Sequence, residues 1–536
     1  MNTNKKNIKS GFLSGIFNPV LVHEFLSSAA AISPDKEAVI FGKERLTYRD
    51  INERSDNLAF SLLKLGLERH DRVIIFGDNS PEIIIGIYAI LKAGGTFIVL
   101  NGLLKSPKLQ YIIKDSGAEF IIVQSSKQEV MAETFKGNEK VIPVIWFGNI
   151  DIPKGKNDFY WNDLIQLPSN ESEILHRRKS EIIDYDLAAL IYTSGSTGEP
   201  KGVMSSHYNM ITAARSIIQY ICNEKDDRIL VVLPLSFDYG LYQVLMTFMF
   251  GGTLILEKSF NFPVEILQVV GREKVTGFPI VPTILAMFLK LKNISRFNLS
   301  SLRYITNTGA ALPVEHIKNF RTLFPTVKFF SMFGLTECKR ISYLDPDLID
   351  KKPGSVGKAI PNCETFLINE NGSLVKPNEI GELIVRGSNV MRGYWNSEEL
   401  TAKVYREWNN NGEKVLFTGD LFYEDDEGFL YFVGRKDDMI KTKGERVSPK
   451  EIENIICTMD GVIEAAVIGI PDEILGQVIK AFIVKKDECN ISSNDVLLYC
   501  SKNMEAFMIP KEIEFLNSLP KSPNGKIDKK LLKQSV

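Results

Sequence analysis

The sequence predicts an α/β fold: a large N-terminal body of α/β subdomains with a small β-barrel-like subdomain, followed by a small C-terminal α+β domain. Apolar runs alternate with helix-like segments up to about residue 354, short strands divided by Gly, Asn and Pro follow, and the charged turn 434–444 precedes a compact last unit. Alternating strands and helices are typical of α/β folds with a mainly parallel sheet. We therefore expect domains at 1–435 and 436–536, with the β-rich part at about 354–434.

In the body, short apolar runs predict strands. These runs cover 72–76, 96–100, 120–123, 141–146, 187–192 and 229–233. The helical spacing of apolar residues over 82–91, which ends at Gly94-Gly95, predicts a helix between the first two strands.

The stretch 239–256 contains 18 residues without a formal charge. Gly251-Gly252 divides it, and the residues after the pair are strand-like. We expect a buried helix that ends at a glycine C-cap and then a buried strand, rather than a membrane-spanning helix.

Short segments of the β-rich part predict strands at 364–368, 382–386 and 429–433. In the last unit, the pattern predicts helices at 449–459 and 493–502 and strands at 464–470 and 478–484. That unit is long enough to fold as a compact domain of about 100 residues.

The composition excludes several functional classes. The chain has 536 residues, of which 44% are apolar and 24% charged, as in soluble globular proteins. A net charge of −2 argues against nucleic-acid binding. The six cysteines form no CxxC motif and the five histidines no HExxH motif, so we expect no zinc site and reduced thiols in the cytoplasm. Polar residues interrupt the apolar run 11–22, which argues against a signal peptide.

The segment 190–203, LIYTSGSTGEPKGV, has the chemistry of a phosphate-binding loop. Its glycines let backbone N–H groups approach an anion, the hydroxyls add donors, and Lys201 adds a charge. It is not a Walker A motif, because Lys201 follows Pro200 and precedes Gly202. The alternative is a solvated Ser/Gly linker, but an apolar strand that leads directly into the loop favours phosphate binding.

YTSGSTGEPKGV resembles the signature loop of the adenylate-forming (ANL) superfamily, which includes acyl-CoA synthetases, peptide-synthetase adenylation domains and luciferases. Further blocks of that family follow the family's order over nearly the whole chain. They are LTYRDINERSDNLAF (46–60), GLTE (334–337), GELIVRGSNVMRGYW (381–395), TGD (418–420), GRKDDMIKTKGERVSPKEIE (434–453) and PKSPNGKID (520–528). Such a series of matches is very specific.

The resemblance implies an AMP-forming ligase. A carboxylate attacks the α-phosphate of ATP, pyrophosphate leaves, and a thiol then attacks the carbonyl of the acyl-adenylate. The implied cofactors are ATP, Mg²⁺ and coenzyme A, or carrier-protein phosphopantetheine in place of coenzyme A. The resemblance assigns catalytic roles to Thr193, Lys201, Glu337 and Lys526, and the Mg²⁺ to Glu337.

The resemblance also implies a nucleotide site. The phosphates would be held by Thr193, Ser194, Gly195, Ser196, Thr197, Gly198, Lys201 and Thr336. The adenine would stack on Phe333, which precedes Gly334, and its edge would lie at Gly309, Ala310 and Ala311. Asp420 would accept both ribose hydroxyls, and Arg435 would contact the nucleotide.

The C-terminal domain is implied to act as a mobile lid that rotates about Asp437 between the two half-reactions. Lys526 would serve the first half-reaction. In the second, Gly444 would lie near the thiol tunnel and Arg446 near the phosphate.

Seven residues are expected to line the substrate pocket: Asp238, Tyr239, Tyr242, Pro279, Thr308, Met332 and Arg340. Asp238 either holds the ammonium group of an amino acid, as in peptide synthetases, or caps the following helix. Arg340 either binds a second anionic group or points to solvent.

Two further functions stay open at this point. The chain stops soon after the Lys526 motif, so we expect a stand-alone ligase that loads coenzyme A or a separate acyl or peptidyl carrier protein. It is alternatively an amino-acid-adenylating enzyme or, remotely, a non-catalytic homologue that binds nucleotide or acyl ligands.

Overall fold

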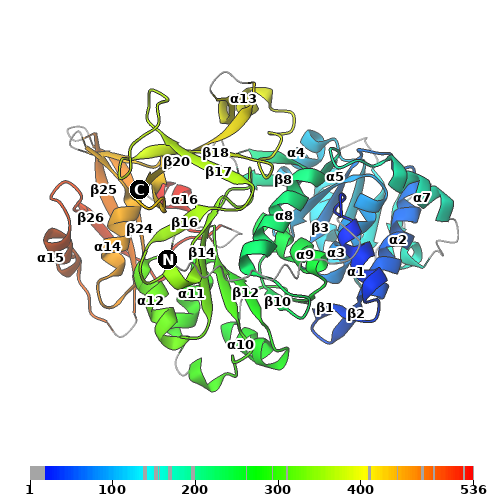
Figure 1. The fold of residues 1–536 in the computed structure, drawn as a ribbon, viewed down its shortest axis with the longest axis horizontal. Helices are drawn as coiled ribbons and strands as arrows, with labels where there is room; N and C mark the ends of the chain where they lie inside the picture. Colours follow the sequence, from blue (N-terminus) through cyan, green and yellow to red (C-terminus); the bar gives the residue numbers. More distant parts are fainter. Residues whose placement is uncertain are drawn as a thin grey trace, which may run out of the picture.

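The computed structural model describes residues 19–136, 142–149, 155, 157–166, 172–194, 199–260, 262–291, 294–309, 312–408, 412–442, 445–472, 476–486, 489–522 and 526–534. The side chains of Ser194 and Arg446 lie outside this description. Two large sheets form the body, and a third sheet lies near the C-terminus (Figure 1).

A seven-stranded sheet occupies the N-terminal part of the body. Its order is β7 (Asp158–Tyr160), β6 (Val144–Phe147), β5 (Phe120–Gln124), β3 (Arg72–Gly77), β4 (Thr96–Asn101), β8 (Leu187–Ser194) and β9 (Pro200–Ser206). All neighbours are parallel except β8 and β9, which form an antiparallel pair. The continuous apolar runs of β3 and β5 reflect burial on both faces, because Val73 and Ile75 pack in one core and Ile74 and Phe76 in another.

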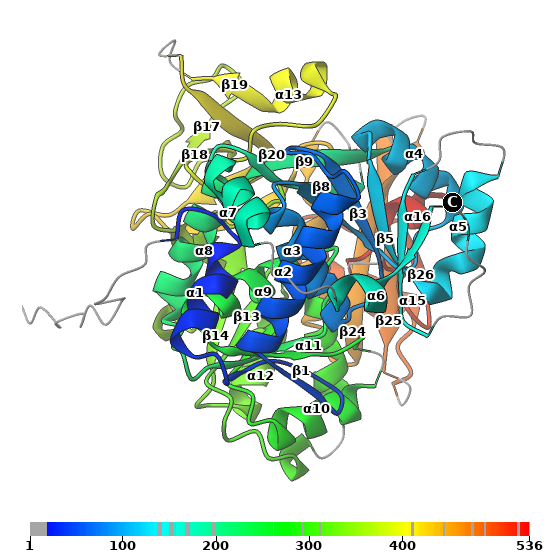
Figure 2. The same cartoon turned by 90° about the vertical axis from the view of Figure 1, so that its right-hand side faces the viewer.

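Helices cover both faces of this sheet (Figure 2). On one face lie α2 (Tyr48–Lys64) and α3 (Pro81–Lys92), and on the other α4 (Ser106–Ser116) and α5 (Gln128–Phe135). The shorter α6 (Trp161–Ile165) and α7 (Ser172–Glu181) contact α2. The α2 helix begins at a capping box, in which the Thr47 side chain accepts from the Asp50 backbone N–H and Asp50 accepts from Thr47.

The second sheet has 14 strands and changes from parallel to antiparallel along its width. Its parallel part contains β1 (Glu37–Phe41), β11 (Thr253–Leu256), β10 (Arg228–Val231), β12 (Gly277–Ile280), β13 (Tyr304–Asn307) and β14 (Lys328–Phe333), with β2 (Glu44–Thr47) antiparallel at the edge. It is packed by α1 (Glu24–Ile32), α8 (His207–Ile221), α10 (Pro263–Arg272), α11 (Pro282–Lys290) and α12 (Val314–Leu323).

The antiparallel part contains the strands expected between about residues 354 and 434. It continues from β14 through β15 (Ser342–Tyr343), β16 (Ser355–Ala359), β21 (Leu430–Arg435), β20 (Lys414–Glu424), β18 (Gly381–Gly387) and β17 (Cys363–Ile368). The strand β19 (Tyr405–Glu407) pairs with β20 and follows α13 (Glu398–Val404). Among the described pairings β17 forms the outer edge, so these strands extend the parallel sheet as an open ladder.

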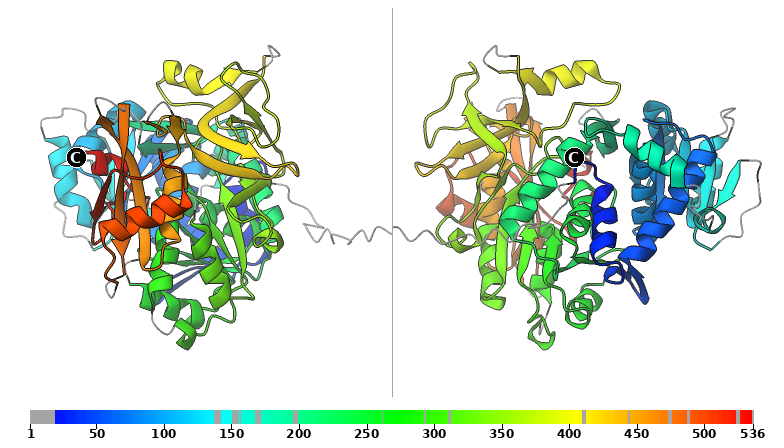
Figure 3. Two further views of the ribbon diagram at one scale, coloured as in Figure 1. Left: turned by 90° about the vertical axis from the view of Figure 1, so that its left-hand side faces the viewer. Right: turned by 45° about the vertical axis from the view of Figure 1, so that its right-hand side comes forward.

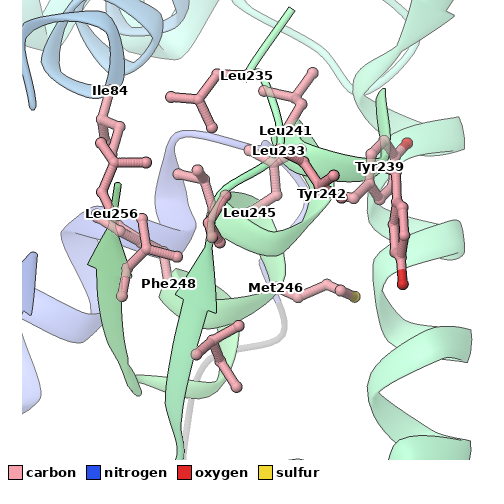
Figure 4. Close-up of a cluster of buried hydrophobic side chains, with 14 of the residues drawn as sticks. Ile84, Leu233, Leu235, Tyr239, Leu241, Tyr242, Leu245, Met246, Phe248 and Leu256 are labelled. Atoms are coloured by element: carbon pink, nitrogen blue, oxygen red, sulfur yellow. The ribbon is translucent and has the colours of Figure 1, made fainter. Parts of the chain in front are cut away.

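The uncharged stretch folds as expected, as α9 (Asp238–Phe250) followed by β11. Gly251 ends the helix with a φ of +71°, the left-handed conformation that glycine adopts without strain. Figure 4 shows Leu245 and Phe248 of α9 beside Leu256 of β11 and Ile84 of α3, so the helix lies between the two body sheets. In the described parts of the chain, no helix has the length and apolar character needed to cross a membrane.

The C-terminal sheet has five strands (Figure 3, left). They are β23 (Glu445–Val447), β22 (Ile440–Thr442), β25 (Gly476–Lys485), β24 (Val462–Asp472) and β26 (Glu512–Phe515). Its core on one face is built with α14 (Pro449–Cys457) and α15 (Ser493–Asn503), and on the other with α16 (Lys529–Gln534). The turn 436–438 connects this unit to β21 of the body.

Candidate active site

Residues from distant parts of the chain meet where strands of the body end. Phe237, Gly309 and Glu337 follow β10, β13 and β14, which belong to the parallel part of one sheet. The carboxyl ends of parallel strands share one edge, where α/β proteins bind their ligands. Lys201 of β9 and Asp420 of β20 approach this edge from the other sheet and from the antiparallel ladder, as the contacts below show.

Lys526, near the C-terminus, reaches into the body. A methyl group added at Gly309 would lie 3.4 Å from Lys526 Cε, and the φ of +90° at Gly309 also disfavours a side chain there. The Lys526 ammonium lies 5.7 Å from the centroid of the Phe237 ring. Its charge also acts on the carboxyl of Asp420. The last segment of the chain thus places a cation beside the strand ends of the body.

The predicted phosphate loop connects β8 and β9, with Thr193 paired to Lys201 across the hairpin. Residues 195–198 lie outside the described residues, as does the side chain of Ser194. The Lys201 ammonium lies 5.8 Å from the ring centroid of Tyr394, and burial lowers its pKa while the charge of Glu337 opposes that shift. Lys201 therefore lies close to the Glu337 carboxylate.

Glu337 is held by a tyrosine that sequence reasoning missed. The Tyr394 hydroxyl donates a hydrogen bond of 2.7 Å to Glu337 Oε1, and the Met391 backbone N–H donates to the Glu337 carbonyl at 2.8 Å. Tyr394 belongs to the block 381–395, whose position among the family motifs was the available signal. The antiparallel ladder thereby positions a carboxylate that follows β14.

The chemistry of this carboxylate fits a shared Mg²⁺ site. Within the described ranges, no three His, Cys, Asp or Glu side chains are grouped so as to hold a metal ion alone. Protein-bound Mg²⁺ commonly has one or two carboxylate ligands, with water and substrate phosphates completing the octahedron. Glu337 near Lys201 and the phosphate-type loop suits an ion whose other ligands come from a nucleotide.

Asp420 is a buried carboxylate poorly supplied with partners. Its side chain is 1% exposed, its Oδ1 lies 3.3 Å from Arg435 Nε, and neither oxygen accepts a hydrogen bond from the residues described. Burial raises the pKa of Asp420 to about 7, although Arg435 opposes the shift. Two unfilled acceptor oxygens in a buried place suit a ligand that brings two hydroxyl donors.

Phe333 is half-buried at the end of β14 and packs edge-on against Phe422 at 4.9 Å between centroids, and stacks with Phe432 at 5.8 Å. Thr336 is half-buried in the turn that follows. Gly334 is required there, because an added Cβ would lie 2.0 Å from the Lys339 carbonyl oxygen. Thr308 is 2% exposed, while Ala310 and Ala311 lie outside the described residues.

The residues expected to line the substrate pocket are buried. The Tyr239 hydroxyl donates to the Thr306 carbonyl at 2.8 Å, and Pro279 pairs with Thr306 in the neighbouring strand. The Tyr220 hydroxyl of α8 donates a hydrogen bond of 3.0 Å to Met332 Sδ. Arg340 is 4% exposed and lies 4.9 Å from the Tyr239 ring centroid, so it points inward rather than to solvent.

The alternative that Asp238 caps α9 is wrong. Phe237 occupies the N-cap position, no side chain caps this end, and Asp238 is the first helical residue. Its charge acts instead on Lys339, which is 2% exposed and lies with its ammonium 5.4 Å from the Tyr242 ring centroid. Sequence reasoning missed Lys339, because adjacent basic residues after a turn are usually exposed.

The described structure tests the remaining predicted residues only in part. Asp437 is exposed in the turn 436–438. Arg446 pairs with Lys441 in the β22–β23 ladder, and no described contact brings it to the nucleotide-site residues. Gly444 lies outside the described residues.

Family profiles match most of the chain. Residues 26–395 match the profile of AMP-binding enzymes, and residues 451–526 match that of the AMP-binding enzyme C-terminal domain. A long-chain-fatty-acid–CoA ligase of Bacillus subtilis (strain 168) is 31% identical over 94% of this chain and 93% of its own length. A feruloyl-CoA synthase of Amycolatopsis sp. is 33% identical over 93% of this chain and 95% of its own.

Solved structures of similar proteins cover the same extent. The anthranilate CoA ligase AuaEII in complex with anthranoyl-AMP superimposes with a TM-score of 0.88 at 26% identity, covering 96% of this chain and 98% of that one. The o-succinylbenzoate CoA synthetase of Bacillus subtilis in complex with the acyl-adenylate OSB-AMP gives a TM-score of 0.79 at 28% identity, with 95% and 97% covered.

Proposed function

The chain belongs to the family of AMP-binding enzymes, and on that basis we propose that it is an AMP-forming acid–thiol ligase. It activates a carboxylic acid with ATP to an acyl-adenylate and transfers the acyl group to coenzyme A. The observation that carries the proposal is the position of Lys526, whose side chain lies against Gly309 and near Phe237 and Asp420. Lys526 puts a positive charge where the strands of the body end. Such a charge suits a reaction in which negative charge develops on phosphate groups.

In the first half-reaction, a carboxylate oxygen of the acid attacks the α-phosphorus of ATP, and the bond to the bridging oxygen of pyrophosphate breaks. Negative charge moves onto the leaving pyrophosphate. Lys526 and Lys201, with backbone donors of the loop 193–201, stabilise this charge by fixed electrostatics. Glu337 would hold Mg²⁺ together with the nucleotide, and the ion would supply charge neutralisation for the triphosphate. The Tyr394 hydroxyl orients Glu337 for that role.

The nucleoside is held on the antiparallel ladder and on the segment after β13. Asp420 accepts hydrogen bonds from both ribose hydroxyls, and Arg435 lies beside it with its guanidinium toward the nucleotide. Phe333 supplies an aromatic face to the adenine, whose edge lies along residues 309–311. The unfilled oxygens of Asp420 support this assignment.

In the second half-reaction, the thiolate of coenzyme A attacks the adenylate carbonyl, and AMP leaves with the electron pair of the broken acyl–oxygen bond. We assign the change between half-reactions to rotation of residues 436–536 about Asp437. Lys526 leaves the site, and Gly444 and Arg446 enter it. Coenzyme A is favoured over a carrier protein because the similar ligases are named for CoA thioesters.

An amino acid is a poorer candidate for the acid. Asp238 is the carboxylate that would hold its ammonium group, and the charge of Asp238 already faces buried Lys339. Arg340 contributes a second buried cation near Tyr239. A positively charged group would be repelled by both cations, so the geometry favours acids without an ammonium group.

A screen of acids tests the proposed function. Carboxylate-dependent exchange between ATP and pyrophosphate is measured with fatty, aromatic, dicarboxylic and amino acids, and AMP release is then followed with coenzyme A. We expect exchange with at least one acid and faster AMP release when coenzyme A is added. Absence of exchange with every acid would favour the non-catalytic homologue. Exchange followed by transfer to a carrier protein, and not to coenzyme A, would favour the other acceptor.

A further inference from the structure

The turn after Glu337 buries a cation that the fold does not pair. Lys339 is 2% exposed, its φ is +63°, and its Nζ has no hydrogen-bond partner in the part of the chain that the structure describes. Burial lowers the pKa of Lys339, and the charge of Asp238 opposes this shift. Burying an ammonium group without a partner is strongly unfavourable, so folds rarely retain one without another purpose.

A second cation lies next to the first. Arg340 is 4% exposed, and its Nε has no hydrogen-bond partner among the residues described, while its guanidinium also interacts with the Tyr220 hydroxyl. Two carboxylates, Asp238 and Glu337, act on Lys339 through their charges, yet Lys339 Nζ has no hydrogen-bond partner among the described residues. This nitrogen is therefore available to donate to a ligand.

Contacts connect Arg340 to Lys526 through two aromatic rings. Arg340 lies 4.9 Å from the Tyr239 ring centroid, that ring lies 6.3 Å from the Phe237 ring, and the Lys526 ammonium lies 5.7 Å from the Phe237 ring centroid. Arg340 and Lys526 thus contact different rings of this group. The carboxylate that reacts with ATP belongs beside Lys526, and an anion at Arg340 belongs to another part of the substrate.

A neighbouring hydroxyl also lacks a partner. Tyr242, whose ring centroid lies 5.4 Å from Lys339 Nζ, has a buried Oη that makes no hydrogen bond to other described residues. Buried polar groups in native proteins are almost always hydrogen-bonded, so this hydroxyl beside Lys339 is consistent with a site that a ligand completes. A hydroxyl donor together with two cations complements a carboxylate, which accepts several hydrogen bonds.

Resting on the proposed ligase function, we propose that Lys339 and Arg340 form an anion-binding subsite that selects acids carrying a second carboxylate at the end remote from the reacting one. Such an acid supplies acceptor oxygens for Lys339 Nζ and Arg340 Nε, which have no hydrogen-bond partner among the described residues. A neutral acyl tail leaves these two nitrogens without an acceptor in a buried place. The charge of Asp238 acts on Lys339 and disfavours a second anion on its own side.

The test compares diacids with their monoamides, which have similar shape but lack the second charge. Dicarboxylic acids of four to eight carbons and benzene dicarboxylic acids are used, and kcat/KM is measured as AMP release with ATP and coenzyme A. We expect at least one diacid to be preferred over its monoamide by about 10- to 100-fold, as for one charged hydrogen-bonded contact.

Variants then assign the preference to the two cations. Lys339→Met and Arg340→Met are expected to lower kcat/KM for the preferred diacid about tenfold or more and to leave the monoamide unchanged or better used. The melting temperature of Lys339→Met should stay unchanged or rise, because an unpaired buried charge is removed. Lys328→Met, at an exposed lysine of β14, serves as the matched control and should change neither quantity.

The outcomes are distinguishable. Equal use of diacids and monoamides by the wild-type protein, or a preference for fatty or amino acids, would overturn the subsite and leave the ligase function standing. Folded variants that lose activity equally on both members of a pair would show a structural role and would also overturn it. Failure of every acid to give AMP would overturn the ligase function and, with it, the subsite. If Lys339→Met fails to fold, the effect of Arg340→Met and the comparison of diacids with monoamides in the wild-type protein still test the subsite.

Discussion

Two buried lysines of the body have opposite surroundings. Lys92 of α3 is fully buried and donates to Asn52 Oδ1 at 2.9 Å and Ser55 Oγ at 2.7 Å, and its ammonium lies 3.0 Å from Asp56 Oδ1. Lys339, 2% exposed, has no such partner among the residues described. The ammonium group of Lys92 thus has hydrogen-bond partners and a carboxylate within the helices, whereas the ammonium group of Lys339, in the turn after β14, has no hydrogen-bond partner among the described residues.

The contrast extends to other charged groups. In the described ranges, the Lys, Arg, Asp and Glu side chains with buried atoms lacking a hydrogen bond are Lys339, Arg340 and Asp420. All three lie around the proposed site for nucleotide and acid. Paired charges mark where the fold supports itself, and unpaired charges mark where a ligand completes it.

Breaking the paired region should have the largest effect on stability. Asp56→Ala leaves Lys92 with an uncompensated buried charge, and we expect destabilisation of about 3 kcal/mol, the lower end for such pairs because Asp56 is 19% exposed. The midpoint of urea unfolding measures it. Asp35→Ala, at a carboxylate of an exposed ion pair, is the control and should shift the midpoint little. Equal shifts for both variants would contradict the contrast.

Removing a buried carboxylate whose hydrogen bonds are unfilled should affect binding instead of stability. Asp420→Ala removes two acceptors for ribose hydroxyls, and we expect kcat/KM for ATP to fall about 10- to 100-fold while the melting temperature does not fall. Asp426→Ala, at an exposed carboxylate in the next turn, should leave kcat/KM unchanged. A large loss of stability without a loss in ATP use would refute the assignment of Asp420.

The pH dependence sharpens the same assignment. Because the pKa of Asp420 is raised from 3.8 to about 7 by burial, its folded form retains the proton longer than the unfolded form. Asp420 therefore favours folding at low pH, and that contribution is lost between pH 3.8 and about 7 as the pH rises. Adenosine, which does not titrate in this range, should bind up to about tenfold more weakly at pH 6 than at pH 8. A flat profile for the wild-type protein, measured by calorimetry, would contradict the role.

Sequence motifs predicted the candidate site residues, and apolar runs predicted the helices and strands. The strands around Val73 and Phe120 and the helix end at Gly251 follow from local patterns. Sequence reasoning did not foresee that β1 pairs with β11, more than 200 residues later, because such pairing depends on tertiary packing.

The sequence was least informative about the surroundings of charged residues. The sequence left open whether Arg340 binds a second anionic group or points to solvent, and it did not single out Lys339, yet both are buried. It also left open whether Asp238 holds an ammonium group or caps α9, and the structure excludes the cap. Burial of a charge is set by contacts distant in sequence, which no local pattern records.

The smallest effect is expected at two neighbouring tyrosines that differ in pairing. Tyr394→Phe removes the hydrogen bond to Glu337, and we expect KM for MgATP to rise about three- to tenfold. Tyr405→Phe, 6.0 Å away between ring centroids, removes a buried hydroxyl without a hydrogen-bond partner in the described structure. It should leave KM unchanged. Equal effects of the two changes on KM would show that Tyr394 does not act through Glu337.

The most direct test of the account separates the two half-reactions in Lys526→Ala, with Lys533→Ala, at an exposed lysine of the same tail, as control. ATP–pyrophosphate exchange reports acyl-adenylate formation, and thioester formation from synthetic acyl-adenylate reports transfer to coenzyme A. We predict that Lys526→Ala slows exchange about 10²- to 10³-fold and leaves transfer within about threefold of wild type. Equal losses in both half-reactions, or no loss of exchange, would contradict the account. In the account, Lys526 of the C-terminal unit serves only the formation of the acyl-adenylate.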